Sequence, residues 1–479
     1  MTSGATTVLW DDPRERLFMV VMGAVFTALF IILVGLSGGR LEAIVFLPVL
    51  AGGLVLLRSV AVALAGMVIM LFTSVTMSYF ASSVVFSVVV ALAVLIHQRD
   101  LSWRALHTPL SVPLTIYGCA VLPSLVNAVD PLHSIALMFN MVAFLVAMYA
   151  TYVSARDLRS VRRLAWWFLG MVILNAVVLI LVALSTGQRQ YGFATIMYVD
   201  YAGLGLCILA SMTIMAKRRR RWVLLSATLL VGAALILTQT RNAWISAFVT
   251  LVVSVLYLAR HPSLTGLSRS ALIRSVMVGL MVLVILATLV VLVNPSIADR
   301  AASTAETEAE ASGETVVVKS SLITRMMIWE ATLNAFLSHP FVGIGVYGFA
   351  KASRQYSHLP RVFYDLYVRD LSPHVTFFAV LAETGLVGMA GFLVFLVGAM
   401  RVSLRTVRTA ANLALQRRAF LGLVGVVYCT VSMFFTDAWL WGHGIVLLGL
   451  IIGLVLANRR ISERHRVAVT PADTPGSEE

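Results

Sequence analysis

The chain has 479 residues, of which 60% are hydrophobic and 12% are charged, and its formal net charge is +14 at pH 7. A soluble domain is about half apolar and about a quarter charged, so this composition excludes an ordinary soluble protein. The apolar runs are roughly 17–25 residues long, which is the length of membrane-spanning helices, and they lack the alternating pattern of membrane strands. We therefore predict an all-α polytopic membrane protein, because a helix satisfies its own backbone in lipid.

The sequence contains about 14 apolar spans of this kind. Basic residues gather in alternate connections between them, and the positive-inside rule makes that face cytoplasmic. An even number of spans then places both termini in the cytoplasm. The positive charge is thus explained by membrane topology, and nucleic-acid binding is not predicted. The predicted spans lie near residues 17–36, 41–57, 60–77, 81–96, 109–126, 133–153, 164–184, 196–216, 222–239, 243–259, 275–293, 377–400, 419–436 and 441–457.

The spans divide the chain into four predicted regions. Residues 1–293 carry transmembrane helices 1–11 with short loops, and residues 377–457 carry transmembrane helices 12–14. Between them, residues 294–376 form a large loop on the outer face, and residues 458–479 form a cytoplasmic tail. The outer loop is the one long polar segment between apolar spans, so it is the first place to look for chemistry.

The outer loop itself has three parts. Residues 301–320 are small, acidic and rich in Ser and Thr, which predicts a flexible insert. Residues 322–337 repeat large apolar side chains at steps of three and four, which predicts an amphipathic helix on the membrane interface or capping the bundle. A turn rich in glycine follows, and residues 351–369 are basic and rich in tyrosine, which suits a surface that faces sugars.

Two arginines lie on the face that the positive-inside rule keeps poor in arginine. Arg241 stands in LTQTRNAWISAF between two apolar spans, and Arg189 stands in STGQRQYGF. A charge at membrane depth faces the bundle interior or a water-filled cavity, or it snorkels to the headgroups. In the first case, both arginines suit an anionic ligand, because guanidinium groups match phosphate oxygens in pairs.

His374 and Glu383 flank the start of the predicted span 377–400. A histidine at the mouth of a span has either a structural role or one in proton transfer near neutral pH. An intramembrane carboxylate usually has a partner, so we expect Glu383 to pair with an arginine or to cap a neighbouring helix. The spacing of His, Cys and Asp indicates no metal site, and no phosphate-binding glycine pattern is present.

Three segments in combination resemble the O-antigen ligase and polymerase superfamily of bacterial envelope glycosyltransferases. TQTRNAWISAF is similar to the family's Thr-x-Ser-Arg-Gly motif, with Asn242 in place of the glycine. WEATLNAFLSHPFVGIGVYGF is similar to its Trp…His-Pro…Gly-x-Gly…Phe segment. HVTFFAVLAETGLVG is similar to its His-Asn…Glu-x-Gly-Leu-x-Gly segment, with Val375 in place of the asparagine.

The resemblance implies a GT-C-type bundle that needs no metal and no cofactor. It implies a donor glycan on undecaprenyl diphosphate, used at the outer (periplasmic) face of the bacterial inner membrane. By the same resemblance, Arg189, Arg241 and Arg325 bind the donor diphosphate, and His374 serves catalysis. Glu383 and the turn glycines Gly343 and Gly345 support the site.

Together these features predict a glycan polymerase, which transfers a growing lipid-linked chain onto a lipid-linked repeat unit. The alternative is a ligase that moves a finished glycan onto lipid A core or another acceptor. The number of spans and the long outer loop favour the polymerase. A lipid-linked oligosaccharide flippase is less favoured, because a transporter places its polar residues near the bilayer midplane. Expected partners are the lipid-linked donor and acceptor, membrane lipids, a chain-length regulator and a flippase.

Overall fold

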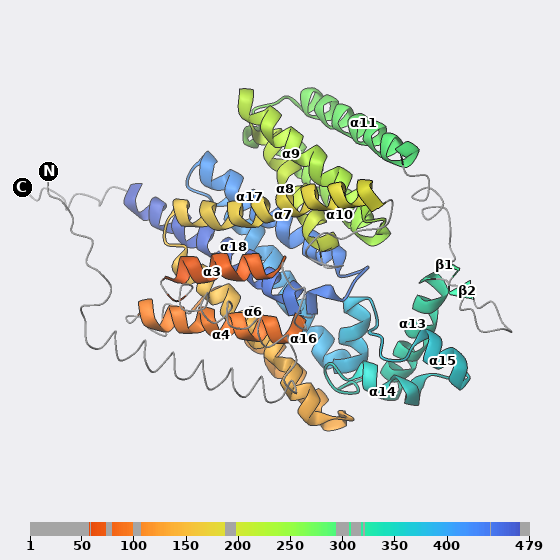
Figure 1. Ribbon diagram of the computed structural model, residues 1–479. Helices are drawn as coiled ribbons and strands as arrows, with labels where there is room; N and C mark the ends of the chain where they lie inside the picture. Colours follow the sequence, from red (N-terminus) through yellow and green to blue (C-terminus); the bar gives the residue numbers. More distant parts are fainter. Residues whose placement is uncertain are drawn as a thin grey trace, which may run out of the picture.

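The computed structural model describes residues 57, 59–72, 79–98, 107–186, 198–293, 306–307, 318–319, 321–440 and 442–469. Apart from one pair of two-residue antiparallel strands, β1 (Glu306–Thr307) and β2 (Val318–Lys319), the regular structure in these residues is helical (Figure 1). Eight of the described helices are long and apolar enough to cross a membrane. The predicted all-helical membrane fold is therefore confirmed within this part of the chain.

Helices occupy the predicted spans from 60–77 onward, whereas span 17–36 and nearly all of span 41–57 lie outside the described residues. Most of the predicted insert 301–320 also lies outside them. The helices of the bundle are α3 (Val60–Met70), α4 (Tyr79–His97), α5 (Ser111–Val121), η2 (Leu122–Asn127), α6 (Pro131–Ser154), α7 (Leu158–Thr186), α8 (Tyr198–Met215), α9 (Arg218–Leu237), α10 (Arg241–Arg260), η4 (Pro262–Leu264), α11 (Arg269–Val293), α16 (Thr376–Arg408), α17 (Leu413–Ser432), η5 (Ala438–Leu440) and α18 (Gly442–Val469).

Local sequence explains where several of these helices begin. Asp130 caps α6 by accepting a hydrogen bond of 3.0 Å from the amide of His133, and Pro131 occupies the first helical position. Asn412 caps α17 in the same way, with 3.0 Å to the amide of Leu415. Such caps satisfy amides that have no partner inside their own helix.

Helix α18 packs against α6 through small residues. Gly449 and Gly453 of α18 lie one turn apart and face the backbone of α6. A Cβ atom on Gly449 would lie 2.6 Å from the carbonyl oxygen of Phe144, and one on Gly453 would lie 2.5 Å from that of Met148. This is the small-xxx-small pattern that lets membrane helices approach closely.

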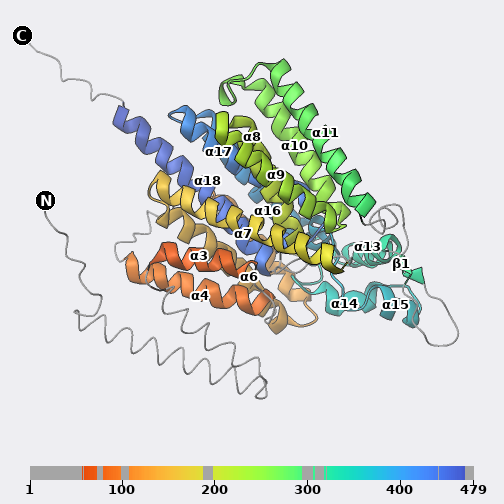
Figure 2. The same cartoon turned by 45° about the horizontal axis from the view of Figure 1, so that its top comes forward.

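The segment predicted to form the outer loop contains α13 (Ser321–Ser338), α14 (Phe349–Tyr356) and α15 (Arg361–Tyr367), which lie together beside one end of the bundle (Figures 1 and 2). They share a small core of their own, to which Tyr364 and Tyr367 belong with exposures of 6% and 5%. These two tyrosines are therefore core residues, and the predicted assignment to a sugar-facing surface is wrong for them.

Helix α13 forms where an amphipathic helix was predicted, but it buries a different face. Met326, Leu333 and Leu337 of the predicted apolar stripe are more than half exposed. The buried face consists of Ile328, Ala331, Thr332 and Ala335. Small side chains allow α13 to pack closely against its neighbours, and the large apolar ones are left on the outer side.

Candidate functional site

Helix α16 is broken at Gly385, where the backbone has φ of 63° and ψ of −165°. Such a break leaves carbonyl and amide groups without partners inside the helix. The turn after α13 supplies these partners through backbone hydrogen bonds. The amides of Leu386 and Val387 donate to the carbonyls of Pro340 and Phe341 at 2.8 and 3.1 Å, and the amides of Ile344 and Gly345 donate to the carbonyls of Ala382 and Glu383, both at 3.1 Å.

The glycines of the two interlocked segments are required by this close approach. Gly343 has φ of 73°, and a Cβ atom there would overlap the backbone of Glu383 and Thr384. A Cβ atom on Gly385 would likewise overlap the backbone of Phe341. A Cβ atom on Gly345, whose φ is 104°, would lie 2.7 Å from Ala128. The HPFVGIG and AETG segments thus form one structural unit.

The carboxylate of Glu383 is buried inside this unit and binds two backbone amides. It accepts hydrogen bonds of 2.9 Å from the amide of Tyr347 and 3.2 Å from the amide of Phe349, at the start of α14. A carboxylate at a helix N-terminus is stabilised by the helix dipole as well as by the amides. The Tyr347 hydroxyl in turn donates to the carbonyl of Leu440 at 2.8 Å, so the turn is fixed to the connection before α18.

His374 lies just before α16 in a left-handed backbone conformation, with φ of 57°. This conformation is uncommon for a residue other than glycine and persists only where the surroundings impose it. Hydrogen bonds hold the residues on both sides of His374 in place. The indole of Trp329 donates to the carbonyl of Pro373 at 3.2 Å, and the hydroxyl of Thr376 donates to the carbonyl of Thr436 at 2.7 Å.

Arg241 is the first residue of α10 and follows a tight turn from α9. Gln239 in that turn has φ of 53°, and the indole of Trp244 donates to the carbonyl of Leu235 at 2.9 Å across it. The turn therefore places the guanidinium group at the N-terminus of a helix, where the dipole also favours anions. Arg189 lies outside the described residues.

The structure brings Arg241, Arg325 and His374 into one electrostatic cluster with Asp437. Arg325 interacts with the charges of both Asp437 and Arg241, and His374 interacts with Asp437 and Arg325. Asp437 is 8% exposed, and its Oδ2 atom makes no hydrogen bond. Sequence reasoning missed Asp437, although it is a lone acid in the short connection between the predicted spans 419–436 and 441–457.

The cluster favours a neutral imidazole beside charged guanidinium groups. Burial lowers the pKa of His374 below its ordinary value of 6.5, the Asp437 carboxylate opposes this, and Arg325 lowers the pKa further. Burial also lowers the pKa of Arg325 from its ordinary value, but guanidinium groups remain charged in proteins. Such a site can hold an anion and accept a proton at neutral pH.

No curated protein matches the chain. Residues 226–393, however, match the family model of the O-antigen ligase domain. The match contains Arg241, Arg325, His374 and the interlocked glycine segments, and it ends before Asp437. This part of the chain is therefore similar to the O-antigen ligase domain, which agrees with the resemblance of its motifs to the O-antigen ligase and polymerase superfamily.

Proposed function

We propose that the protein polymerises oligosaccharide repeat units carried on undecaprenyl diphosphate. The observation that carries the proposal is the cluster of Arg241, Arg325, His374 and Asp437 beside the ends of apolar helices. The arginines, with Arg189, bind the donor diphosphate, and the membrane bundle receives its lipid. The site faces the periplasm, both termini are cytoplasmic, and a flippase and a chain-length regulator act with the protein in the inner membrane.

The proposed reaction exchanges one carbon–oxygen bond for another. A hydroxyl oxygen of the acceptor sugar attacks the anomeric carbon of the donor, and the bond from that carbon to the diphosphate oxygen breaks. The hydroxyl proton passes to the neutral His374 and then to water, and the lipid diphosphate leaves with the bonding electron pair. Fixed guanidinium groups stabilise the charge that develops on the diphosphate, which is the task that favours the transition state most.

Activity in a purified system tests the proposal directly. The protein, given a lipid-diphosphate glycan and an acceptor lipid in the presence of EDTA, should extend the glycan. EDTA belongs in the assay because the arginines supply the positive charge that a metal would otherwise supply. Absence of extension with every lipid-linked donor and acceptor tried, in a correctly folded preparation, would overturn the proposal.

Glycans in a deletion strain separate the polymerase from the ligase alternative. Single repeat units attached to the final acceptor indicate a lost polymerase. Long chains that accumulate on the carrier lipid indicate a lost ligase. We expect the first result, because the predicted number of spans and the large outer loop favour a polymerase.

Replacing Arg241 by alanine should lower kcat/KM for glycan extension about a hundredfold, the loss typical of one preorganised charge-stabilising group. The matched control is Arg260→Ala, which removes an arginine at the other end of the same helix. Equal activity of the two variants would contradict a role of Arg241 at the diphosphate.

Replacing Asp437 by asparagine should move the pH profile of the reaction. The Asp437 carboxylate raises the pKa of His374, so its removal lowers that pKa. Activity that requires neutral His374 is lost as pH falls through this pKa. The acid limb of kcat/KM should therefore shift to lower pH, with about tenfold lower activity at the optimum, because a less basic imidazole takes the hydroxyl proton less readily. Asp370→Asn, at an exposed acid four residues before His374, should leave the acid limb in place.

A further inference from the structure

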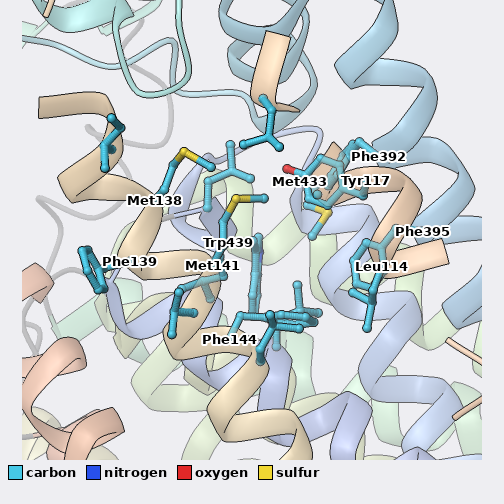
Figure 3. Close-up of a pocket in the computed structure, with 18 of the residues that line it drawn as sticks. Leu114, Tyr117, Met138, Phe139, Met141, Phe144, Phe392, Phe395, Met433 and Trp439 are labelled. Atoms are coloured by element: carbon cyan, nitrogen blue, oxygen red, sulfur yellow. The ribbon is translucent and has the colours of Figure 1, made fainter. Parts of the chain in front are cut away.

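A second site of different chemistry lies inside the bundle. A pocket of about 440 Å³ is lined by residues of several elements. These are α5, η2, α6, the part of α16 that follows Gly385, the 433–440 connection and the start of α18. Figure 3 shows Tyr117 and Phe392 on one wall, Met138 and Met141 on the opposite wall, and Trp439 between them. The volume falls in the range of about 300–1,000 Å³ that is typical of small-molecule sites.

The lining of this pocket selects an apolar chain. Apart from the hydroxyl of Tyr117 and the indole of Trp439, its side chains are aliphatic, aromatic or methionine, and none is charged. Methionine side chains adapt to irregular apolar ligands. Along α6, the wall residues Ile135, Phe139 and Val142 are about half exposed, so the pocket is open on a side that a membrane would cover.

The pocket and the polar cluster share the 433–440 connection. Met433, Trp439 and Leu440 line the pocket, and the same connection carries Asp437. The amide of Thr376, two residues after His374, donates to the carbonyl of Met433 at 3.0 Å. A chain seated in the pocket therefore lies against the segment that carries Asp437 and that is hydrogen-bonded to Thr376, two residues after His374.

The pocket is separate from the helix that carries Arg241. Helix α10 packs against α8 and α17, whereas the pocket lies among α5, α6, α16 and α18. Helix α17 packs against α8 and α10 and also against α16 and α18, so it stands between the two regions. A donor whose lipid lies on the α10 side of α17, with its diphosphate at Arg241, thus leaves the pocket free for another lipid.

We infer that this pocket receives the isoprenoid chain of the acceptor, so that donor and acceptor lipids occupy separate sites. The inference rests on the proposed polymerase function, in which both substrates are lipid-linked. The acceptor hydroxyl must reach His374, and the pocket is an apolar space lined by Met433, whose carbonyl is hydrogen-bonded to the amide of Thr376 just after that residue.

Gly118 offers a clean way to test the pocket. It lines the pocket, and a Cβ atom there would meet nothing within 4 Å, so Gly118→Leu fills the pocket without a backbone clash. Gly279→Leu is the matched control, since Gly279 lies on α11 with equally open space around its Cβ position. The probes are one glycan repeat on a full-length polyprenyl diphosphate and the same repeat on a short anchor of two isoprene units.

Gly118→Leu should raise KM for the long-chain acceptor about tenfold, the effect of excluding roughly two methylene groups, with kcat within about twofold. The rate with the short-chain acceptor and KM for the donor should not change. An unchanged acceptor KM, an equal defect with the short chain, or a raised donor KM would each overturn the inference. Wild-type protein that extends neither acceptor would instead refute the proposed function, so the two failures are distinguishable.

Photocrosslinking supplies a measurement that does not depend on activity. A polyprenyl diphosphate with a benzophenone on its chain should label peptides of α5 and α6 in the wild-type protein and less in Gly118→Leu. Unlabelled polyprenyl diphosphate should compete for this labelling, and phosphatidylglycerol should not. Competition by phosphatidylglycerol alone would assign the pocket to a membrane phospholipid and overturn the inference.

Discussion

Replacing His374 by asparagine should lower kcat for glycan extension by about a thousandfold. The loss corresponds to removal of a positioned general base, which contributes about 10²–10⁴-fold. Asparagine is chosen because it tolerates the left-handed conformation that His374 adopts, with φ of 57°, better than alanine does. The hydrogen bonds from the Trp329 indole to Pro373 and from the Thr376 hydroxyl to Thr436 should then persist, so the variant loses the imidazole and keeps the fold.

A matched histidine in the same loop controls this experiment. His358 is exposed between α14 and α15, and His358→Asn should retain full activity. In the wild-type protein, kcat/KM should fall on the acid side through a pKa below 6.5, because burial favours neutral His374. Wild-type kcat in His374→Asn, or an acid limb at or above the ordinary histidine pKa, would remove His374 from the proposed mechanism.

Replacing Gly343 by alanine should destabilise the folded protein by about 2–5 kcal/mol, the sum of left-handed strain and steric overlap. The Cβ atom would meet backbone atoms of Glu383 and Thr384, which cannot rotate away as a side chain can. The interlock between the turn and the break in α16 would open, and the amides of Tyr347 and Phe349 would lose the carboxylate that they bind. Thermal unfolding in detergent, with size-exclusion chromatography, measures the effect.

Gly266→Ala separates the two contributions to this cost. Gly266 has φ of 70°, close to the 73° of Gly343, but its Cβ position has nothing within 4 Å. The control should therefore show only the strain of the left-handed conformation, about 1–2 kcal/mol. Equal destabilisation of the two variants would mean that the close approach to α16 contributes nothing to stability.

The interlock matters for chemistry because it fixes elements on which the polar cluster depends. It joins α13, which carries Arg325, to the break in α16, and His374 lies just before the start of that helix. Glu383 extends the connection to α14, and the Tyr347 hydroxyl extends it to Leu440. Catalytic groups need positions fixed to a fraction of an ångström, and backbone hydrogen bonds on rigid helices provide this.

The sequence by itself determined the membrane helices and the chemistry of individual residues. Long apolar runs can satisfy their backbone in lipid only as helices, so their positions are readable from composition along the chain. Arg241 was noticed because it lies on the membrane face where the positive-inside rule predicts few arginines. Arg325 was noticed because its segment resembles a motif of the O-antigen ligase and polymerase superfamily. Composition alone could not predict that these two arginines lie in one cluster with His374.

Tertiary structure decided the features that depend on partners distant in the chain. Asp437 joins the cluster only because Thr376 is bonded to the connection that carries it. The break at Gly385 and the role of Glu383 depend on backbone groups of a turn about 40 residues earlier, and backbone amides leave no signature in side-chain patterns. Helix α13 also depends on its distant neighbours. It buries the face with small residues, which packs closely against them, and leaves its apolar stripe exposed.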